Sequence, residues 1–253
     1  MKNLKNIAML IDADNTQLSK LESVIQEIST NGRIVVKRAY GNWRKGSLKN
    51  WENELKRLAI KAEQQFDYVA GKNATDMALV IDTLDLLHSG IYDAFVIVAS
   101  DSDYTPLAIK LRESGVFVMG VGEKKTPEPF RNACDEFVYL ENLSKDTQTA
   151  AVQKPAETAK RNAQESAEER RKAKELKEIH KLLRIAWDKY QDDDGYVNVS
   201  SAGQYIKRAR PDFDARTYGY VKLPELIEAF PKRYSMKRYP GKGTVTIIAY
   251  KCL

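Results

Sequence analysis

The sequence predicts an α/β domain with a parallel sheet, then a charged linker, then a small domain of three helices and a β-hairpin. Over residues 1–143, short apolar runs alternate with segments of helical length, as in strands joined by crossover helices. Over residues 175–253, three helical patterns precede two strand-like runs around a Pro-Gly-Lys-Gly turn, which is typical of a winged-helix module. A chain of 253 residues is long enough for two such domains.

Six apolar runs are the candidate strands of the first domain, and four segments of helical length lie between them. The predicted strands are residues 7–11, 34–40, 66–70, 94–99, 116–121 and 136–140. The predicted helices are residues 18–29, 48–64, 76–88 and 104–113. Runs 7–11 and 94–99 are apolar throughout, as expected of central strands buried on both faces. We therefore expect a parallel sheet flanked by helices.

Residues 144–174 separate the two domains. This segment has almost no large apolar residue, so it cannot bury a core, and its Ala, Glu, Lys and Arg content favours partial helix. Residues 1–143 hold 18 Lys+Arg against 20 Asp+Glu, a net charge of −2, whereas residues 144–253 hold 23 against 15, a net charge of +8. Such an excess attracts polyanions, of which nucleic acid is the commonest, although a basic surface can also serve solubility alone.

No apolar run approaches the ~20 residues of a membrane-spanning helix. Cys134 and Cys252 lie far apart and fit neither a disulfide framework nor a zinc site. We therefore expect a cytoplasmic protein without membrane association. His88 and His180 are its only histidines, which excludes a histidine-rich metal site.

Acidic side chains follow the first and fourth predicted strands. Asp12, Asp14 and Asn15 end IAMLIDADN, and Asp101 and Asp103 end FVIVASDSD. In an open parallel sheet, ligands bind at the carboxyl ends of strands where the strand order reverses. If these two strands are neighbours, Asp12 and Asp101 face each other. Gathered carboxylates are costly unless a cation neutralises them, and oxygen ligands suit Mg²⁺ or Mn²⁺.

The helix predicted at residues 76–88 adds a third acidic group. Asp76 opens this helix, and Asp82 follows nearly two turns later, less surely on the same face. A capping role, in which Asp76 complements the helix dipole, is the alternative. Lys72 is either a phosphate contact or an ordinary surface lysine. Together, the acidic groups predict a site where one or two metal ions activate water against a phosphodiester.

Three motifs carry a family resemblance: IDADN, GKNATDMALVIDTLDLL and VIVASDSDYTPLAIKLRESGVFVMGVG. In this order and spacing they resemble the NYN family of PIN-like ribonucleases, the bacterial branch with DUF88 and LabA-type proteins, over most of residues 5–143. The resemblance implies a PIN-like fold and a metal-dependent endonuclease that usually acts on RNA. By motif it implies catalytic, metal-binding roles for Asp12, Asp76, Asp101 and Asp103, with Asn15 and Ser100 assisting and Asp82 at a second recurrent acidic position.

A second resemblance lies near the C-terminus. FDARTYGYVKLPELIEAFP resembles the LOTUS domain, also called OST-HTH, over about residues 176–251. This implies a winged-helix module that binds RNA or protein partners and is known fused to NYN domains. Basic side chains there supply phosphate contacts, and tyrosines among them either stack on bases or complete the core. The predicted nucleic-acid-binding residues are Lys207, Arg208, Arg210, Arg216, Tyr220, Lys222, Lys237, Arg238 and Lys242.

No motif suits a rival enzyme, since there is neither a GxxxxGK[ST] loop nor a GxGxxG after the first strand. We expect a metal-dependent endoribonuclease whose C-terminal module delivers or orients the RNA. Two alternatives stay open: a catalytically inactive RNA-binding adaptor, and a nuclease that acts on DNA. A protein partner for the C-terminal module and a homodimer stay open as well.

Overall fold

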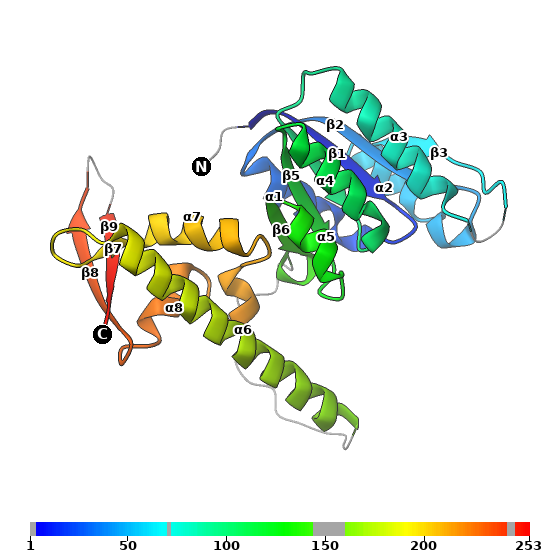
Figure 1. Ribbon diagram of the computed structural model, residues 1–253. Coiled ribbons are helices and arrows are strands. Elements are labelled where there is room, and N and C mark those ends of the chain that lie inside the picture. Colours follow the sequence, from blue (N-terminus) through cyan, green and yellow to red (C-terminus); the bar gives the residue numbers. More distant parts are fainter. Residues whose placement is uncertain (1–3, 70–71, 144–159, 242–245) are drawn as a thin grey trace. The chain divides into compact units, whose positions relative to one another are not determined.

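The computed structural model describes residues 4–69, 72–143, 160–241 and 246–253, with only the backbone for residues 160–171 (Figure 1). The chain forms two compact units, Met1–Gln148 and Thr149–Leu253. Of the predicted linker, residues 144–159 lie outside the described residues. Within the described ranges, no helix is long and apolar enough to cross a bilayer.

The first unit is built on a six-stranded, fully parallel sheet in the order β3-β2-β1-β4-β5-β6. Its strands are β1 (Leu4–Asp12), β2 (Gly32–Gly41), β3 (Lys61–Gln64), β4 (Ala94–Val98), β5 (Phe117–Gly122) and β6 (Glu136–Tyr139). β1 and β4 are neighbours, with Ile7 opposite Ala94 and Ile11 opposite Val98. The strand order therefore reverses between them, as the predicted site requires.

Helices cover both faces of this sheet (Figure 1). They are η1 (Leu18–Lys20), α1 (Leu21–Ser29), η2 (Gly46–Leu48), α2 (Trp51–Arg57), α3 (Ala74–His88), η3 (Ser102–Tyr104), α4 (Thr105–Glu113), α5 (Glu128–Ala133) and η4 (Leu140–Leu143). Buried residues of α1 and α2 share one core with Ile7, Met9 and Ile11 of β1. Those of α3, α4 and α5 share the other core with Ala8 and Leu10. The alternation along β1 thus assigns each residue to a face, and Asp12 follows Leu10 on the α3 side.

Two predicted elements of this unit are wrong. The helix expected at residues 48–64 ends at Arg57, because Ala59 has a φ of 50°, outside the helical region. The third strand lies at Lys61–Gln64, not at residues 66–70, where Phe66, Tyr68 and Val69 are exposed and residue 70 lies outside the described residues. β3 is an edge strand with mostly exposed side chains, so KAEQ shows no apolar pattern.

The second unit combines helices with a small antiparallel sheet of strand order β7-β9-β8. Its elements are α6 (Lys160–Tyr190), β7 (Val197–Asn198), α7 (Val199–Ala209), η5 (Ala215–Tyr218), α8 (Leu223–Glu228), β8 (Tyr234–Pro240) and β9 (Thr246–Cys252). The predicted three helices and hairpin are confirmed, and β7 adds a short third strand. The predicted linker residues 160–174 lie in α6.

Local signals set the helix ends of the second unit. The Asn198 side chain accepts a hydrogen bond from the backbone N–H of Ser200 (2.8 Å) and caps α7. Pro224 lies in the first turn of α8, where a missing N–H costs little. The buried core is formed by Ile179, Leu183, Ala186, Val197, Val199, Ala202, Ile206, Phe213, Leu226, Ile227, Tyr234 and Tyr250.

Candidate active site

The carboxyl edge of β1 and β4 carries a group of acidic side chains, of which Asp12 is the deepest. Asp12 ends β1 and is 0% exposed. Its Oδ2 accepts a hydrogen bond from Asn15 Nδ2 (2.9 Å), and its Oδ1 accepts one from the Asn15 backbone N–H (3.3 Å). Burial, reinforced by the charges of Asp76 and Asp14, raises the pKa of Asp12 to about 6. The structure therefore places Asn15 as the partner that orients this carboxylate.

Asp76 lies in the first turn of α3 and is half-buried. Its Oδ1 accepts a hydrogen bond from the Tyr104 hydroxyl (2.7 Å). Burial raises the pKa of Asp76, and the neighbouring charges of Asp101 and Asp103 act in the same direction. Asp76 therefore lies close enough to Asp101 and Asp103 to feel their charges, and its own charge acts on Asp12.

Asp101 and Asp103 follow β4 on either side of a tight turn. Asp101 is half-buried, and its Oδ1 accepts a hydrogen bond from the Asp103 backbone N–H (3.0 Å). Asp103 is exposed, and its Oδ2 accepts a hydrogen bond from Asn73 Nδ2 (2.9 Å) just before α3. A cavity of about 550 Å³ opens beside them, lined by Asn73, Asp76, Met77, Val80, Ser102, Asp103, Tyr104, Thr105, Pro106 and Pro129.

Tyr104 is a site residue that the sequence analysis missed. It is fully buried, and burial, followed by the charges of Asp12 and Asp76, raises the pKa of its phenol. The phenol therefore stays protonated and donates its hydrogen bond to Asp76, and the charge of Asp12 also acts on it. The only sequence signal was its position directly after Asp103 in SDSDY.

Three predicted supporting residues lie outside the carboxylate group: Asp82 and Ser100 have other partners, and Lys72 is exposed. Asp82 accepts hydrogen bonds from Arg38 Nη1 (2.6 Å to Oδ2) and from the Tyr40 hydroxyl. Ser100 Oγ accepts a hydrogen bond from the Glu123 backbone N–H (3.0 Å) at the end of β5. Lys72 is exposed in the segment before α3. The structure thus places Asp12, Asn15, Asp101 and Asp103 at the carboxyl edge of β1 and β4, links Asp76 to this edge through Tyr104, and places Asp82 in a separate ion pair with Arg38 of β2.

Asp14 connects the acidic group to a basic loop. Its carboxylate lies 3.4 Å from Lys45 Nζ and accepts a hydrogen bond from Thr75 Oγ1 (3.2 Å). Lys45 also lies 3.5 Å from Asp67. Lys45 is a second residue that sequence analysis missed, because its approach to Asp14 is purely tertiary.

The donor set has the chemistry that Mg²⁺ or Mn²⁺ requires. The predicted ligands are all carboxylate oxygens, and the raised pKa values of Asp12 and Asp76 reflect burial and neighbouring carboxylates, whose cost a divalent cation would offset. Across the described ranges, no three Asp, Glu, His or Cys side chains are grouped closely enough to enclose an ion. The residues therefore fit the metal by their donor atoms, although the arrangement shown is not a closed coordination shell.

Two predicted nucleic-acid-binding arginines of the second unit are held in ion pairs. Arg210 lies 2.7 Å from Glu178 and 3.2 Å from Asp212. Arg216 lies 2.7 Å from Asp214. Because these carboxylates neutralise both guanidinium groups, a phosphate would have to compete for them.

The remaining basic candidates lie on the surface of the second unit. On the β8 strand of the predicted wing, Lys237 lies 3.4 Å from Asp194 and Arg238 pairs with Glu228. Tyr220 is half-buried against the core, and Lys242 lies outside the described residues. The exposed candidates are Lys207, Arg208, Lys222, Lys237 and Arg238.

Comparison with known proteins agrees with this two-domain arrangement. The NYN domain matches residues 6–141, and the OST-HTH/LOTUS domain matches residues 171–246. No curated protein matches the chain. A solved protein of unknown function from Vibrio parahaemolyticus is similar at 15% identity and a TM-score of 0.46, covering 55% of this chain and 94% of its own. An uncharacterized protein from Nitrosomonas europaea is similar at 23% identity and a TM-score of 0.28, covering 44% of this chain and 89% of its own.

Neither structural likeness bears on function, whereas the NYN match spans more than half of the chain. The chain belongs to the NYN family, with a PIN-like nuclease domain followed by an OST-HTH/LOTUS domain of the nucleic-acid-binding type.

Proposed function

We propose that the protein is a metal-dependent endoribonuclease that hydrolyses RNA phosphodiesters at the carboxyl edge of β1 and β4. The observation that supports the proposal is that Asp12 and the Asp101 turn follow the neighbouring strands β1 and β4, with Asp76 joined to that turn through the Tyr104 hydroxyl. Asp103 adds a carboxylate on the wall of the adjoining cavity. RNA phosphates carry the same sign of charge as these carboxylates, so a strand would bind at this wall only when a cation lies between them.

The chain's own residues would hold and orient the metal. Asp12, Asp76, Asp101 and Asp103 are its ligands in this proposal, and when bound the ion supplies charge neutralisation at the phosphate and a water of lowered pKa. Asn15 fixes both Asp12 oxygens, and Tyr104 fixes one Asp76 oxygen. These contacts leave the carboxylates with few alternative orientations.

No histidine serves as a general base in this proposal. His88 is exposed at the far end of α3 from Asp76, and His180 is buried in the second unit. Proton transfer from water therefore depends on the carboxylates and the metal.

The OST-HTH/LOTUS domain supports a nucleic acid as the substrate through its charge. Residues 144–253 carry the net charge of +8. The exposed Arg208 and Lys222 offer cations for phosphates, whereas a phosphate at Lys237 or Arg238 on β8 would compete with Asp194 or Glu228. A protein partner for this domain and a homodimer are competing uses of the same surface, and both are detectable by mass measurement in solution.

The proposal is tested by incubating the full chain with labelled single- and double-stranded RNA and DNA. Each substrate is combined with Mg²⁺, Mn²⁺ or EDTA, and Asp101→Asn is compared with Asp85→Asn. Asp85 is a matched control because it is an exposed carboxylate on α3. We expect RNA cleavage with either metal that survives in Asp85→Asn and is lost in Asp101→Asn and in EDTA. Cleavage that persists in EDTA would contradict the proposal, and preferred cleavage of DNA would reassign the substrate.

A catalytically inactive RNA-binding adaptor is the second candidate. It is favoured by the open arrangement of the carboxylates, since no three ligand side chains surround one point in the part of the chain that the structure describes. Salt-sensitive RNA binding, without cleavage of any substrate in any metal, would assign this function.

A further inference from the structure

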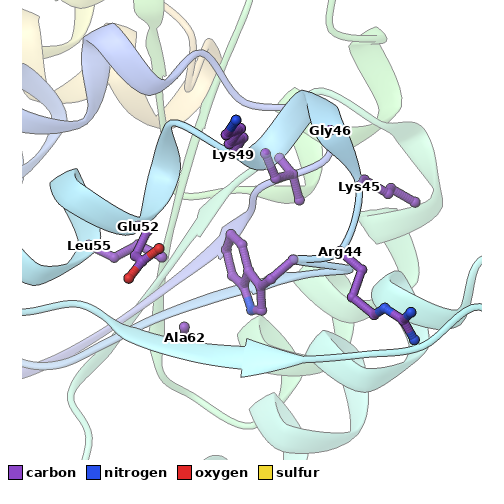
Figure 2. A pocket seen from close by; sticks show the side chains of 9 residues that line it. Arg44, Lys45, Gly46, Lys49, Glu52, Leu55 and Ala62 are labelled. Atoms are coloured by element: carbon purple, nitrogen blue, oxygen red, sulfur yellow. The ribbon is translucent and has the colours of Figure 1, made fainter.

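A second cavity in the NYN domain lies apart from the carboxylates, on the loop that follows β2. Its volume is about 340 Å³. Its lining residues are Trp43, Arg44, Lys45, Gly46, Leu48, Lys49, Glu52, Leu55 and Ala62. We call it the Trp43 pocket. Figure 2 shows Arg44 and Lys45 at one end of it and Glu52 and Leu55 at the other.

The indole of Trp43 is held in place by the neighbouring edge strand. Its Nε1–H donates to the backbone oxygen of Glu63 (3.1 Å), and its backbone N–H donates to Gln64 Oε1 (3.1 Å). The ring packs against Trp51, with centroids 6.0 Å apart and planes tilted by 50°. A half-exposed aromatic ring that is already fixed can stack on a ligand without ordering cost.

The rim of the Trp43 pocket is basic, although its domain as a whole is acidic. Arg44 and Lys49 are exposed and form no ion pair within the described residues. The one acidic lining residue, Glu52, lies 2.5 Å from Lys56 and is neutralised there. Arg44, Lys45 and Lys49 thus surround an aromatic and aliphatic wall. The net charge of −2 of residues 1–143 does not account for this local group of cations.

Lys45 joins this pocket to the acidic site. It lines the pocket and lies 3.4 Å from Asp14, two residues after Asp12. The negative charge of Asp14 also acts on Asp12 and Asp76. The ammonium group of Lys45 therefore lies between the Trp43 pocket and Asp14, at the edge of the acidic site.

We propose that the Trp43 pocket binds an unpaired base of single-stranded RNA, with the flanking phosphates on Arg44 and Lys49, and so positions the strand beside the carboxylates. A fixed aromatic ring among cations is the arrangement with which proteins hold unstacked bases and the backbone between them. Bases within a duplex are already stacked and paired, so the pocket selects single strands. This inference deepens the proposed function and rests on it for the choice of RNA.

The first test measures RNA binding by the full chain in EDTA, where metal-dependent cleavage is absent. Anisotropy of a labelled single-stranded RNA is followed across a salt series for the wild type, Arg44→Ala/Lys49→Ala and Arg33→Ala/Lys110→Ala. Arg33 and Lys110 are matched controls, because both are exposed and neither lines the pocket. We expect the pocket variant to bind several-fold more weakly and to lose about 1.4 from its log–log salt slope, at about 0.7 per phosphate contact.

The control variant should retain both the affinity and the slope. Equal losses in the two variants would show a general charge effect and overturn the inference. A loss seen with single-stranded DNA but not with RNA would overturn the choice of RNA.

The second test locates the base directly. RNA carrying 4-thiouridine is photocrosslinked to the full chain in EDTA, and the modified peptide is identified by mass spectrometry. We expect a crosslink within residues 42–49 that is lost in Trp43→Leu and retained in Trp43→Phe, with folding of both checked by circular dichroism. Crosslinks confined to residues 160–253 would overturn the inference.

These binding tests fail independently of the proposed function. A chain that cleaves RNA without crosslinking at the pocket contradicts this inference alone. A chain that crosslinks there without cleaving any substrate contradicts the nuclease alone.

Discussion

The Tyr104 hydroxyl donates a hydrogen bond to Asp76 Oδ1 at 2.7 Å, and thereby joins the turn after β4 to the first turn of α3. The phenol is buried, and the charges of Asp12 and Asp76 both raise its pKa. This donor occupies Oδ1 of Asp76 and leaves its Oδ2 available for a cation.

Removing this donor should reduce cleavage without unfolding the domain. Tyr104→Phe keeps the buried ring but leaves Asp76 without its partner, so we expect an RNA cleavage rate about tenfold lower, equal to about 1.4 kcal/mol. Initial rates over a Mn²⁺ series measure the effect. Tyr92→Phe is the control, since Tyr92 also packs in this core, edge-on to Phe95. Equal rates for Tyr104→Phe and the wild type would show that the hydrogen bond has no catalytic role.

Asp82 should matter for stability and not for catalysis. It binds Arg38 and Tyr40 on β2, and its side chain is 26% exposed. Asp82→Asn weakens a charge-assisted contact with Arg38. We therefore expect the free energy of unfolding, measured by denaturant titration, to fall by about 2 kcal/mol. RNA cleavage measured well below the unfolding midpoint should remain at the wild-type rate. Full stability combined with lost cleavage would give Asp82 the supporting role in the site that the family resemblance implies.

Asp12 should destabilise the metal-free protein at neutral pH. The pKa of Asp12 is about 6 in the folded state, above the ordinary value of 3.8. Between these two values the native state therefore holds a proton on Asp12 that the unfolded state has lost. The stability linked to this proton is fully present below pH 3.8 and is lost as pH rises through 6. In EDTA at pH 7.5, Asp12→Asn should therefore be more stable than the wild type, by on the order of 1–3 kcal/mol.

Thermal unfolding with and without Mn²⁺ checks this expectation. The ion should stabilise the wild type and have less effect on Asp12→Asn. A variant less stable than the wild type in EDTA at pH 7.5 would contradict the burial cost assigned to Asp12.

The second unit contains a histidine with a lowered pKa. Burial, with a smaller effect of Arg233, lowers the pKa of His180 below 6.5. Its Nδ1 lies 2.8 Å from the Tyr234 hydroxyl, and its ring meets the edge of Phe230. Stability linked to neutral His180 is present above pH 6.5 and is lost as pH falls through the lower folded value.

Proton NMR of the full chain tests this point, because the chain has only two histidines. The His180 ring signal should titrate with a midpoint below 6.5, and His88→Gln assigns it by removing the other signal. A midpoint above 6.5 for His180 would contradict its burial in this core.

The central strands were predictable because burial leaves a continuous apolar pattern. β1 and β4 are buried on both faces, and their ends carry Asp12 and Asp101 as expected. β3 was misplaced because an edge strand need not be apolar, and Phe66 and Tyr68 mimic a strand while lying exposed. Local pattern therefore identified the middle of the sheet and failed at its edge.

The acidic group was predictable to the extent that strand ends fix it. β1 and β4 are neighbours, so Asp12 lies near the turn that holds Asp101. Predicting this proximity requires only the strand order. The contacts of Asp82 with Arg38 and of Lys45 with Asp14 depend on tertiary distances that no spacing encodes. In the sequence, Tyr104 looks like an ordinary core aromatic. Only its hydrogen bond to Asp76, which the fold creates, indicates a role in the site.

Single-turnover cleavage tests the central claim most directly, because saturating protein separates the chemical step from RNA binding. A labelled single-stranded RNA is mixed with excess wild type, Asp12→Asn or Asp85→Asn in Mn²⁺, and binding of each is measured separately in EDTA. We predict that Asp12→Asn binds as tightly as the wild type and loses at least a hundredfold in cleavage rate, on the order expected for a ligand of a catalytic ion, whereas Asp85→Asn cleaves normally. Wild-type rates in Asp12→Asn would contradict a nuclease site at the carboxyl edge of β1 and β4.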